Sequence, residues 1–217
     1  MSGTPQRFDL REIAPQPWKN GAGVTREIAF GGAGAAAFDW RLSVAEVDRD
    51  APFSAFPGVD RCIVLLRGAG MRLRSTDRAL DHALTMPLEP FRFSGDDALD
   101  ATLVDGPCSD FNVMTRRGTW RSEVNVLLTE APLRPADMAM ALCIEGTWSI
   151  AGEALAPLQG LLLPLPPGEG RGEGARPEAA PSKSTLPVAR PHPNPLPEGD
   201  GVTPALLVVR LIRNIAS

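Results

Sequence analysis

Charged and amide side chains in the first half of the chain have the types and spacing of an anion-binding site. Residues 17–26 read Pro-Trp-Lys-Asn-Gly-Ala-Gly-Val-Thr-Arg, which places Lys19 and Asn20 directly beside two glycines. A plain turn would need only the glycines. Lys and Arg bind carboxylates, and the Arg guanidinium does so with two parallel hydrogen bonds. The segment therefore predicts a loop that binds a small anion.

Alternation along the following run places one of these charges on a face that should be buried. Arg26 has the same parity as Val24, Ile28 and Phe30, which predicts that its side chain points into the interior. Glu27 lies on the opposite face and cannot neutralise it directly. A buried guanidinium requires a carboxylate partner or an anionic ligand. We therefore expect Arg26 to contribute to the anion site.

Two further runs present polar residues on one face. Along residues 40–44, Arg41 and Ser43 alternate with apolar residues, and along 111–117 the even-numbered residues are Asn, Met and Arg. Such faces are typical of a pocket wall that combines polar and soft apolar groups. The full set of expected ligand-binding residues is Lys19, Asn20, Arg26, Arg41, Ser43, Ser54, Asp60, Arg61, Asp110, Asn112, Met114 and Arg116.

A structural network is the alternative to a binding pocket. In that interpretation the same charges pair with one another, for instance Asp60 with Arg61 or Asp110 with Arg41, and hold the mouth of a barrel closed. Both interpretations place the charges inside strands.

The runs that carry these residues have the period of two that is typical of strands. They are residues 24–30, 38–47, 61–66, 71–73, 111–115 and 124–128. Gly68 and Gly70 separate two of the runs at a hairpin distance, and Pro or Gly recurs between the others. Residues 135–140 are the one place compatible with a short helix, and even there the apolar run continues into Leu142 and Ile144 as in a strand. The pattern predicts an all-β sandwich or barrel architecture.

Four segments carry a family resemblance when they are taken in order. They are residues 17–26, 40–45 (Trp-Arg-Leu-Ser-Val-Ala), 52–61 (Pro-Phe-Ser-Ala-Phe-Pro-Gly-Val-Asp-Arg) and 110–118 (Asp-Phe-Asn-Val-Met-Thr-Arg-Arg-Gly). Together they resemble the HutD/Ves family of bacterial proteins. The resemblance implies a double-cupin fold of RmlC-like jelly-roll barrels and a link to histidine utilisation or stress responses. It also implies a small-ligand binder or regulator without an established reaction.

Composition divides the chain into two expected cupin units and an insertion. We expect an N-terminal unit at 1–118 and a C-terminal unit at 119–163 and 202–217. Residues 164–201 combine many prolines with Gly, Glu and Arg and contain few large apolar residues. Such a segment cannot bury enough surface to offset its ordering entropy, which predicts a disordered insertion that can be deleted without loss of folding. A proline-rich ligand for an SH3-type domain is the functional alternative.

Catalytic chemistry has few candidate residues in this sequence. A catalytic cupin holds its metal with two or three His and a Glu, whereas this chain has two histidines in total. His192 lies in the expected insertion and His82 in an expected loop. The chain has no Tyr for a His–Tyr proton-transfer pair, and Ser54 lacks a nucleophile elbow. We therefore expect no metal, no cofactor and no catalytic residue.

Composition also argues against several classes of partner. The chain has 217 residues, 43% of them hydrophobic, and a net charge of −4 with dispersed basic residues. Neither a nucleic-acid footprint nor a polybasic membrane patch is present. The first residues lack the apolar core of a signal peptide, and the chain is expected to be cytoplasmic. Cys62, Cys108 and Cys143 lack CxxC spacing, which favours reduced, buried thiols.

These observations predict a metal-independent protein that binds a small carboxylated metabolite in its N-terminal unit and regulates histidine utilisation. The resemblance alone names formylglutamate as a candidate ligand. The alternative from another class is a metal-free hydrolase or isomerase that acts on a small amide or carboxylate, with Lys19, Asp60 or Asp110 as acid or base. A third interpretation is a structural interaction module, and the sequence is compatible with a homodimer.

Overall fold

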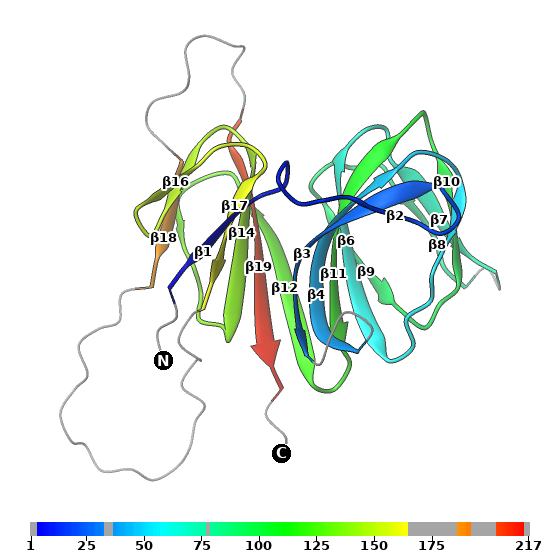
Figure 1. Cartoon of the computed structure of the whole chain (residues 1–217), viewed down its shortest axis with the longest axis horizontal. Helices are drawn as coiled ribbons and strands as arrows, with labels where there is room; N and C mark the ends of the chain where they lie inside the picture. The colour runs from blue at the N-terminus through cyan, green and yellow to red at the C-terminus, as the bar shows by residue number, and fades with distance from the viewer. Residues whose placement is uncertain (1–3, 33–36, 77–78, 165–185, 192–202, 215–217) are drawn as a thin grey trace.

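The structure, a computed structural model, describes residues 4–32, 37–76, 79–164, 186–191 and 203–214. All regular secondary structure among these residues is β, and every pair of neighbouring strands is antiparallel. The strands form two halves that stand side by side (Figure 1). The prediction of an all-β protein is therefore confirmed. Within the described ranges there is no helix with the length and apolar character that a membrane span requires.

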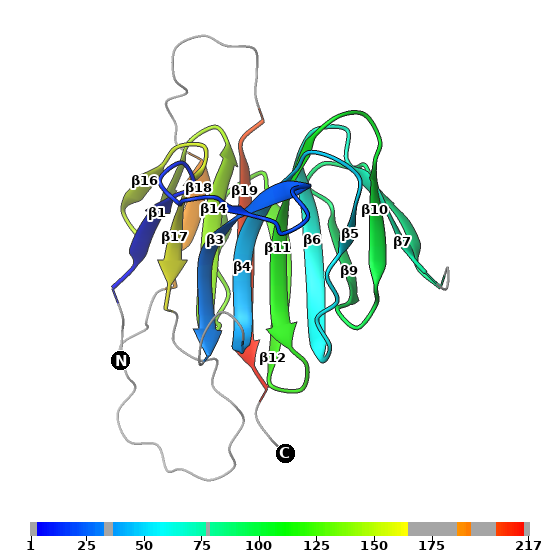
Figure 2. The same cartoon turned by 45° about the vertical axis from the view of Figure 1, so that its right-hand side comes forward.

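The N-terminal half consists of a six-stranded and a four-stranded sheet. The six-stranded sheet, seen in Figure 2, has the order β2 (Gln16–Pro17), β3 (Gly23–Gly32), β4 (Phe38–Val47), β11 (Cys108–Arg116), β6 (Val59–Arg67) and β9 (Pro90–Ser94). The four-stranded sheet has the order β5 (Ala51–Phe53), β10 (Leu99–Leu103), β7 (Met71–Ser75) and β8 (Asp81–Leu84). Apolar side chains from both sheets, among them Ile63, Leu65, Met71 and Leu73, form a common core. This half is therefore a two-sheet sandwich.

The C-terminal half repeats this plan. Its five-stranded sheet has the order β1 (Gln6–Asp9), β17 (Gln159–Leu163), β14 (Met138–Glu145), β19 (Ala205–Arg213) and β12 (Trp120–Leu127). Its four-stranded sheet has the order β13 (Ala131–Pro132), β18 (Val188–Pro191), β15 (Trp148–Ile150) and β16 (Glu153–Leu155). The core between these sheets contains Trp148, Ile150 and Leu155, which are fully buried.

A third core joins the two halves. Leu42 and Val44 of β4 and Met140 and Leu142 of β14 belong to one buried cluster. The large sheet of each half therefore has both faces covered, one by its own small sheet and the other by the neighbouring half. This arrangement explains why β14 is almost continuously apolar.

Two stretches belong to the C-terminal half although the sequence did not assign them to it. Strand β1 pairs with β17, so residues 6–9 belong to the C-terminal half and not to the N-terminal unit expected at 1–118. Strand β18 lies inside the insertion expected to be disordered, pairs with β13 and β15, and buries Ala189 completely. The expectation of disorder throughout 164–201 is therefore wrong for 188–191. Residues 165–185 and 192–202 lie outside the described residues.

Two local predictions were also wrong. Residues 135–140 contain no helix, because Ala139 and Met140 alternate between the C-terminal core and the shared core as part of β14. Gly68 and Gly70 do not close a hairpin, since β6 and β7 belong to different sheets. Both glycines have a φ of 88°, a left-handed conformation that favours Gly where the chain crosses between the sheets.

Deletion of residues 164–201, with a short Gly/Ser turn in their place, is expected to destabilise the protein. The deletion removes β18 and uncovers Trp148 and Ile150 of β15. We expect the free energy of unfolding to fall by about 2–4 kcal/mol, the cost of exposing one or two large buried side chains. The denaturant midpoint measures this loss, and Ala189→Asp in the full chain should lower the midpoint as well because it buries an unpaired charge. A deletion variant as stable as the parent would show that β18 contributes nothing.

Candidate ligand-binding site

A pocket of about 650 Å³ opens on the inner face of the six-stranded sheet. We call it the N-terminal pocket. Nine of the twelve residues expected to bind a ligand line it, namely Lys19, Asn20, Arg41, Ser43, Ser54, Arg61, Asp110, Asn112 and Met114. Its volume lies within the range of small-molecule sites, about 300–1,000 Å³. A cavity therefore lies where the sequence predicts a binding pocket.

Three neighbouring strands build the floor of the N-terminal pocket as cross-strand rows. Met114 of β11 stands between Arg41 of β4 and Arg61 of β6. Two residues earlier along β11, Asn112 stands between Ser43 and Ile63, and Asp110 stands between Ala45 and Leu65. Residues at i and i+2 on a strand share a face, so the rows follow from the alternation of side chains. Two guanidinium groups therefore lie at one end of the floor and one carboxyl group at the other, with Asn112 between them.

Asp110 is the most unusual residue of the pocket. Its side chain is fully buried between Ala45 and Leu65, and neither carboxyl oxygen has a hydrogen-bond partner of normal geometry among the described residues. Burial raises the pKa of the Asp110 carboxyl to about 7, while the nearby Arg61 charge and the Asn112 amide act in the opposite direction. A carboxyl group in this state is ionised in about half of the molecules at neutral pH.

Arg61 is the buried cation of the same site. Its side chain is 6% exposed, and its guanidinium carbon lies 4.8 Å from the centre of the Phe93 ring and 5.5 and 5.6 Å from the Phe56 and Phe53 rings. Its Nη1 donates a long hydrogen bond of 3.4 Å to the Ser54 carbonyl oxygen, and Nε has no partner among the described residues. Burial lowers the pKa of Arg61 to about 10, so it remains charged at neutral pH.

The glycine-rich loop forms the rim of the pocket. The Trp18 Nε1 donates to Thr25 Oγ1 at 2.7 Å, and its ring packs edge-on against Phe53. The Asn20 Oδ1 accepts a hydrogen bond from the Ala22 amide, which makes Asn20 part of the turn as well as of the rim. A Cβ atom on Gly23 would lie 2.3 Å from the Glu46 carbonyl oxygen, so only glycine fits there. The loop is thus held in place by its own side chains.

Arg41 is partly neutralised by a neighbour that the sequence did not suggest. Its Nε donates to Glu27 Oε2 at 2.7 Å, and both side chains are largely buried. Glu27 stands opposite Ser43 in the pairing of β3 with β4, beside a bulge between Glu27 and Ala29. Alternation along the strand correctly predicted that Glu27 and Arg26 lie on opposite faces. It could not identify Arg41 as the partner of Glu27, because alternation within one strand does not show which residue of the neighbouring strand lies opposite.

Three of the twelve expected residues lie outside the pocket. Arg26 points to the opposite face of the sheet and pairs with Glu46. Asp60 binds Arg117 at the surface, and Arg116 pairs with Asp39. The pairs expected in a structural network, Asp60 with Arg61 and Asp110 with Arg41, do not form among the described residues.

The described residues do not supply a metal site of the cupin type. No group of three or more His, Cys, Asp or Glu gathers among them, and Asp110 is the one acid among the described residues that line the N-terminal pocket. His82 was expected in a loop but lies in β8, where its ring stacks on Phe91 at 3.5 Å. The donor set of the described residues therefore does not match a cupin metal site.

Comparison with known proteins identifies the family. The HutD family profile matches residues 10–167, most of the chain. This chain belongs to the HutD family. Protein Ves of Escherichia fergusonii is 35% identical over 154 residues, which cover 70% of this HutD chain and 80% of the relative.

Two solved structures share the fold of this chain. HutD from Pseudomonas fluorescens SBW25, solved in a formate condition, superposes with a TM-score of 0.77 at 23% identity over 98% of this chain and all of the other (100%). A cupin 2 conserved barrel domain protein from Leptotrichia buccalis has a TM-score of 0.50 at 10% identity, with 97% of each chain covered. The fold of this HutD protein is therefore cupin-like.

Proposed function

We propose that this HutD protein binds a small carboxylated metabolite in its N-terminal pocket, without a metal. One observation carries the proposal: Asp110, Asn112 and Arg61 are all buried on the pocket floor, yet each has a polar side-chain atom without a partner among the described residues. An unpaired buried polar atom costs about 1–3 kcal/mol, and a charged one costs more. A ligand that satisfies these atoms recovers this cost on binding. In this interpretation the two sandwiches are two cupin units, and the first binds this metabolite.

The arrangement of the floor suggests the chemistry of the ligand. Arg61 and Arg41 at one end suit a carboxylate, and Lys19 at the rim can bind a second one. Asp110 and the Asn112 Oδ1 accept hydrogen bonds, so the other end suits an N–H or O–H donor. N-formyl-L-glutamate has two carboxylates and one amide N–H, and it fits this order of groups. The proposed role in regulating histidine utilisation rests on HutD membership.

Asp110 also supports a second candidate function, that of a metal-free hydrolase or isomerase. A general base works best when its pKa lies near the operating pH, and burial brings the pKa of Asp110 to about 7. Asp60 is a weak candidate for this role because it binds Arg117 outside the pocket. Turnover of N-formyl-L-glutamate by chelator-treated protein, lost in Asp110→Asn, would establish an enzyme. Stable binding without turnover favours the regulator.

Arg41→Met and Arg26→Met form a matched pair of variants that tests where the ligand binds. Both remove one guanidinium from an ion pair, on adjacent strands, but the Arg41 pair is more buried than the Arg26 pair, and only Arg41 lines the N-terminal pocket. In calorimetric titrations with N-formyl-L-glutamate, Arg41→Met should weaken binding by about 1–2 kcal/mol, the contribution of a hydrogen bond to a charged group. Arg26→Met should leave the affinity unchanged and reduce stability by less than about 1 kcal/mol.

The opposite result in these titrations would place the ligand elsewhere. If Arg26→Met weakened binding and Arg41→Met did not, the ligand would sit on the outer face of the sheet, and the proposed pocket would be wrong.

A further inference from the structure

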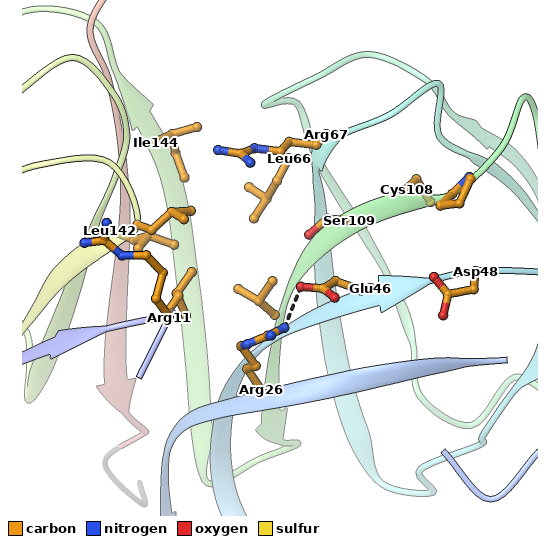
Figure 3. Close-up of a pocket in the computed structure, with 14 residues that line it drawn as sticks. Arg11, Arg26, Glu46, Asp48, Leu66, Arg67, Cys108, Ser109, Leu142 and Ile144 are labelled. Atoms are coloured by element: carbon orange, nitrogen blue, oxygen red, sulfur yellow. Dashed lines mark hydrogen bonds and ion pairs between the residues drawn. The ribbon is translucent and has the colours of Figure 1, made fainter. Parts of the chain in front are cut away.

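A second cavity, of about 410 Å³, lies at the seam between the two halves, on the opposite face of the sheet that floors the N-terminal pocket (Figure 3). We call it the seam cavity. Its walls come from both halves: Val44 and Leu66 belong to the N-terminal half, and Leu142 and Ile144 belong to β14 of the C-terminal half. The cavity borders the core that joins the two halves, since Val44 and Leu142 belong to that core and also line the cavity.

The seam cavity has a polar rim above its apolar walls. Arg11, Arg26 and Arg67 all line it. Arg11 is bound to Asp9, and Arg26 is bound to Glu46. The Arg67 side chain has no hydrogen bond or ion pair with any residue that the structure describes. In Figure 3 its guanidinium extends from the end of β6 across the gap towards Ile144, and the Asp48 carboxylate lies well apart from it.

A bulge places Arg67 at the cavity. Successive residues of a strand normally point to opposite faces. The pairing of β11 with β6 shifts between Ser109 and Asp110, so that Asp110 stands opposite Leu65 and Ser109 stands opposite Arg67. Leu66 and Arg67 consequently both line the seam cavity, and Ser109, which stands between Arg67 and Glu46 in the sheet, lines it as well. Bulges often redirect side chains beside functional sites.

We propose that the seam cavity binds an amphipathic monocarboxylate, with the alkyl chain between the two sheets and the carboxylate on Arg67 and Ser109. The apolar walls suit a hydrocarbon body, and the free guanidinium at the rim suits one negative charge. The volume is near the lower end of the range for metabolite sites, which favours a chain of about six to eight carbons over a long acyl chain. This site is independent of the function proposed for the N-terminal pocket.

Sodium octanoate is a suitable probe in the full chain labelled at the Ile δ1 methyl groups. Ile144 reports on the seam cavity and Ile63 on the core beside the N-terminal pocket. We expect a saturable shift of the Ile144 methyl signal without a comparable shift of Ile63. Arg67→Gln should weaken octanoate binding about tenfold, the loss of one charged hydrogen bond. Arg41→Met should not change it.

Two controls separate this site from adventitious binding. Octylamine has the same chain with the opposite charge and should not shift Ile144, and Leu66→Trp should fill the cavity and abolish the octanoate effect. Unchanged melting temperatures of Arg67→Gln and Leu66→Trp would show that the variants fold. The proposal is overturned if octanoate shifts Ile63 instead, if it shifts neither methyl, if octylamine binds equally well, or if Arg67→Gln binds like the parent.

Discussion

Replacement of Asp110 by Asn is expected to stabilise the free protein at pH 8 by up to about 4 kcal/mol, the free energy that separates a folded pKa of about 7 from an unfolded pKa of about 3.9. Asn has the shape of the protonated carboxyl group and carries no charge. The buried carboxylate has no hydrogen-bond partner of normal geometry among the described residues, so removing its charge removes a desolvation cost. Most substitutions of buried residues destabilise. A gain in stability would mark Asp110 as a residue kept for binding.

The same substitution should change the pH dependence of stability. The folded pKa of Asp110 is about 7, above the unfolded value of about 3.9. Between these values the folded protein binds the proton and the unfolded chain has released it. The contribution of Asp110 to stability therefore falls as the pH rises from about 4 to 7, and it is constant above that range. Denaturant midpoints between pH 4 and 8 should show this fall in the parent and a smaller one in Asp110→Asn.

A rise in pH should increase the ligand affinity, whereas it lowers the stability. An amide N–H of the ligand binds best to ionised Asp110, so the affinity of the parent for N-formyl-L-glutamate should increase as the pH rises through about 7. Asp110→Asn should weaken binding at pH 8 and flatten this profile. A variant that loses stability but retains affinity would assign Asp110 to the structure of the protein and not to its ligand.

Replacement of Arg61 by Met should have the largest effect on affinity. Met keeps a flexible apolar stem against Phe53, Phe56 and Phe93 but has no charge. We expect carboxylate binding to weaken by about 1.5–3 kcal/mol, or about 10- to 150-fold. The loss of the neighbouring positive charge should also raise the pKa of Asp110 further. Calorimetric titration measures the affinity, and a denaturant series on the same preparation measures the stability.

The stability of Arg61→Met separates the pocket from a structural network. A buried cation replaced by a hydrophobic residue of similar volume is often neutral or stabilising, whereas loss of one partner of a buried ion pair costs about 3–5 kcal/mol. Arg61 forms no salt bridge among the described residues, so we expect little loss of stability. Arg116→Met, which removes a guanidinium outside the pocket, should leave the affinity unchanged. A loss of 3 kcal/mol with unchanged affinity would support the network.

Alternation in the sequence was sufficient to predict several elements of the site. The run 38–47 coincides with β4, and its parity correctly separated Arg41 and Ser43 from the apolar face of Leu42 and Val44. Parity succeeded because side chains alternate strictly along a regular strand. The same rule shows that Asp60 and Arg61, as consecutive residues of β6, cannot both point into one pocket.

Arg26 shows where such reasoning fails. Its parity with Val24 and Ile28 was correct, but the apolar face of β3 lies against the other half of the protein and not inside the N-terminal sandwich. Both faces of the large sheet are covered, so apolar character does not identify the pocket side. Strand β18 was missed for a different reason: four paired residues in a Pro-rich segment give too little periodicity to predict a strand.

Calorimetric titration of N-formyl-L-glutamate into chelator-treated protein at pH 8, for the parent, Asp110→Asn and Arg61→Met, tests the binding claim most directly. We expect one ligand per chain without added metal, with affinity reduced in both variants and Asp110→Asn more stable than the parent. Glutamate and succinate titrated in parallel show which groups the pocket selects. Absence of binding by all three carboxylates, or binding that both substitutions leave unchanged, would contradict a carboxylate site in the N-terminal pocket.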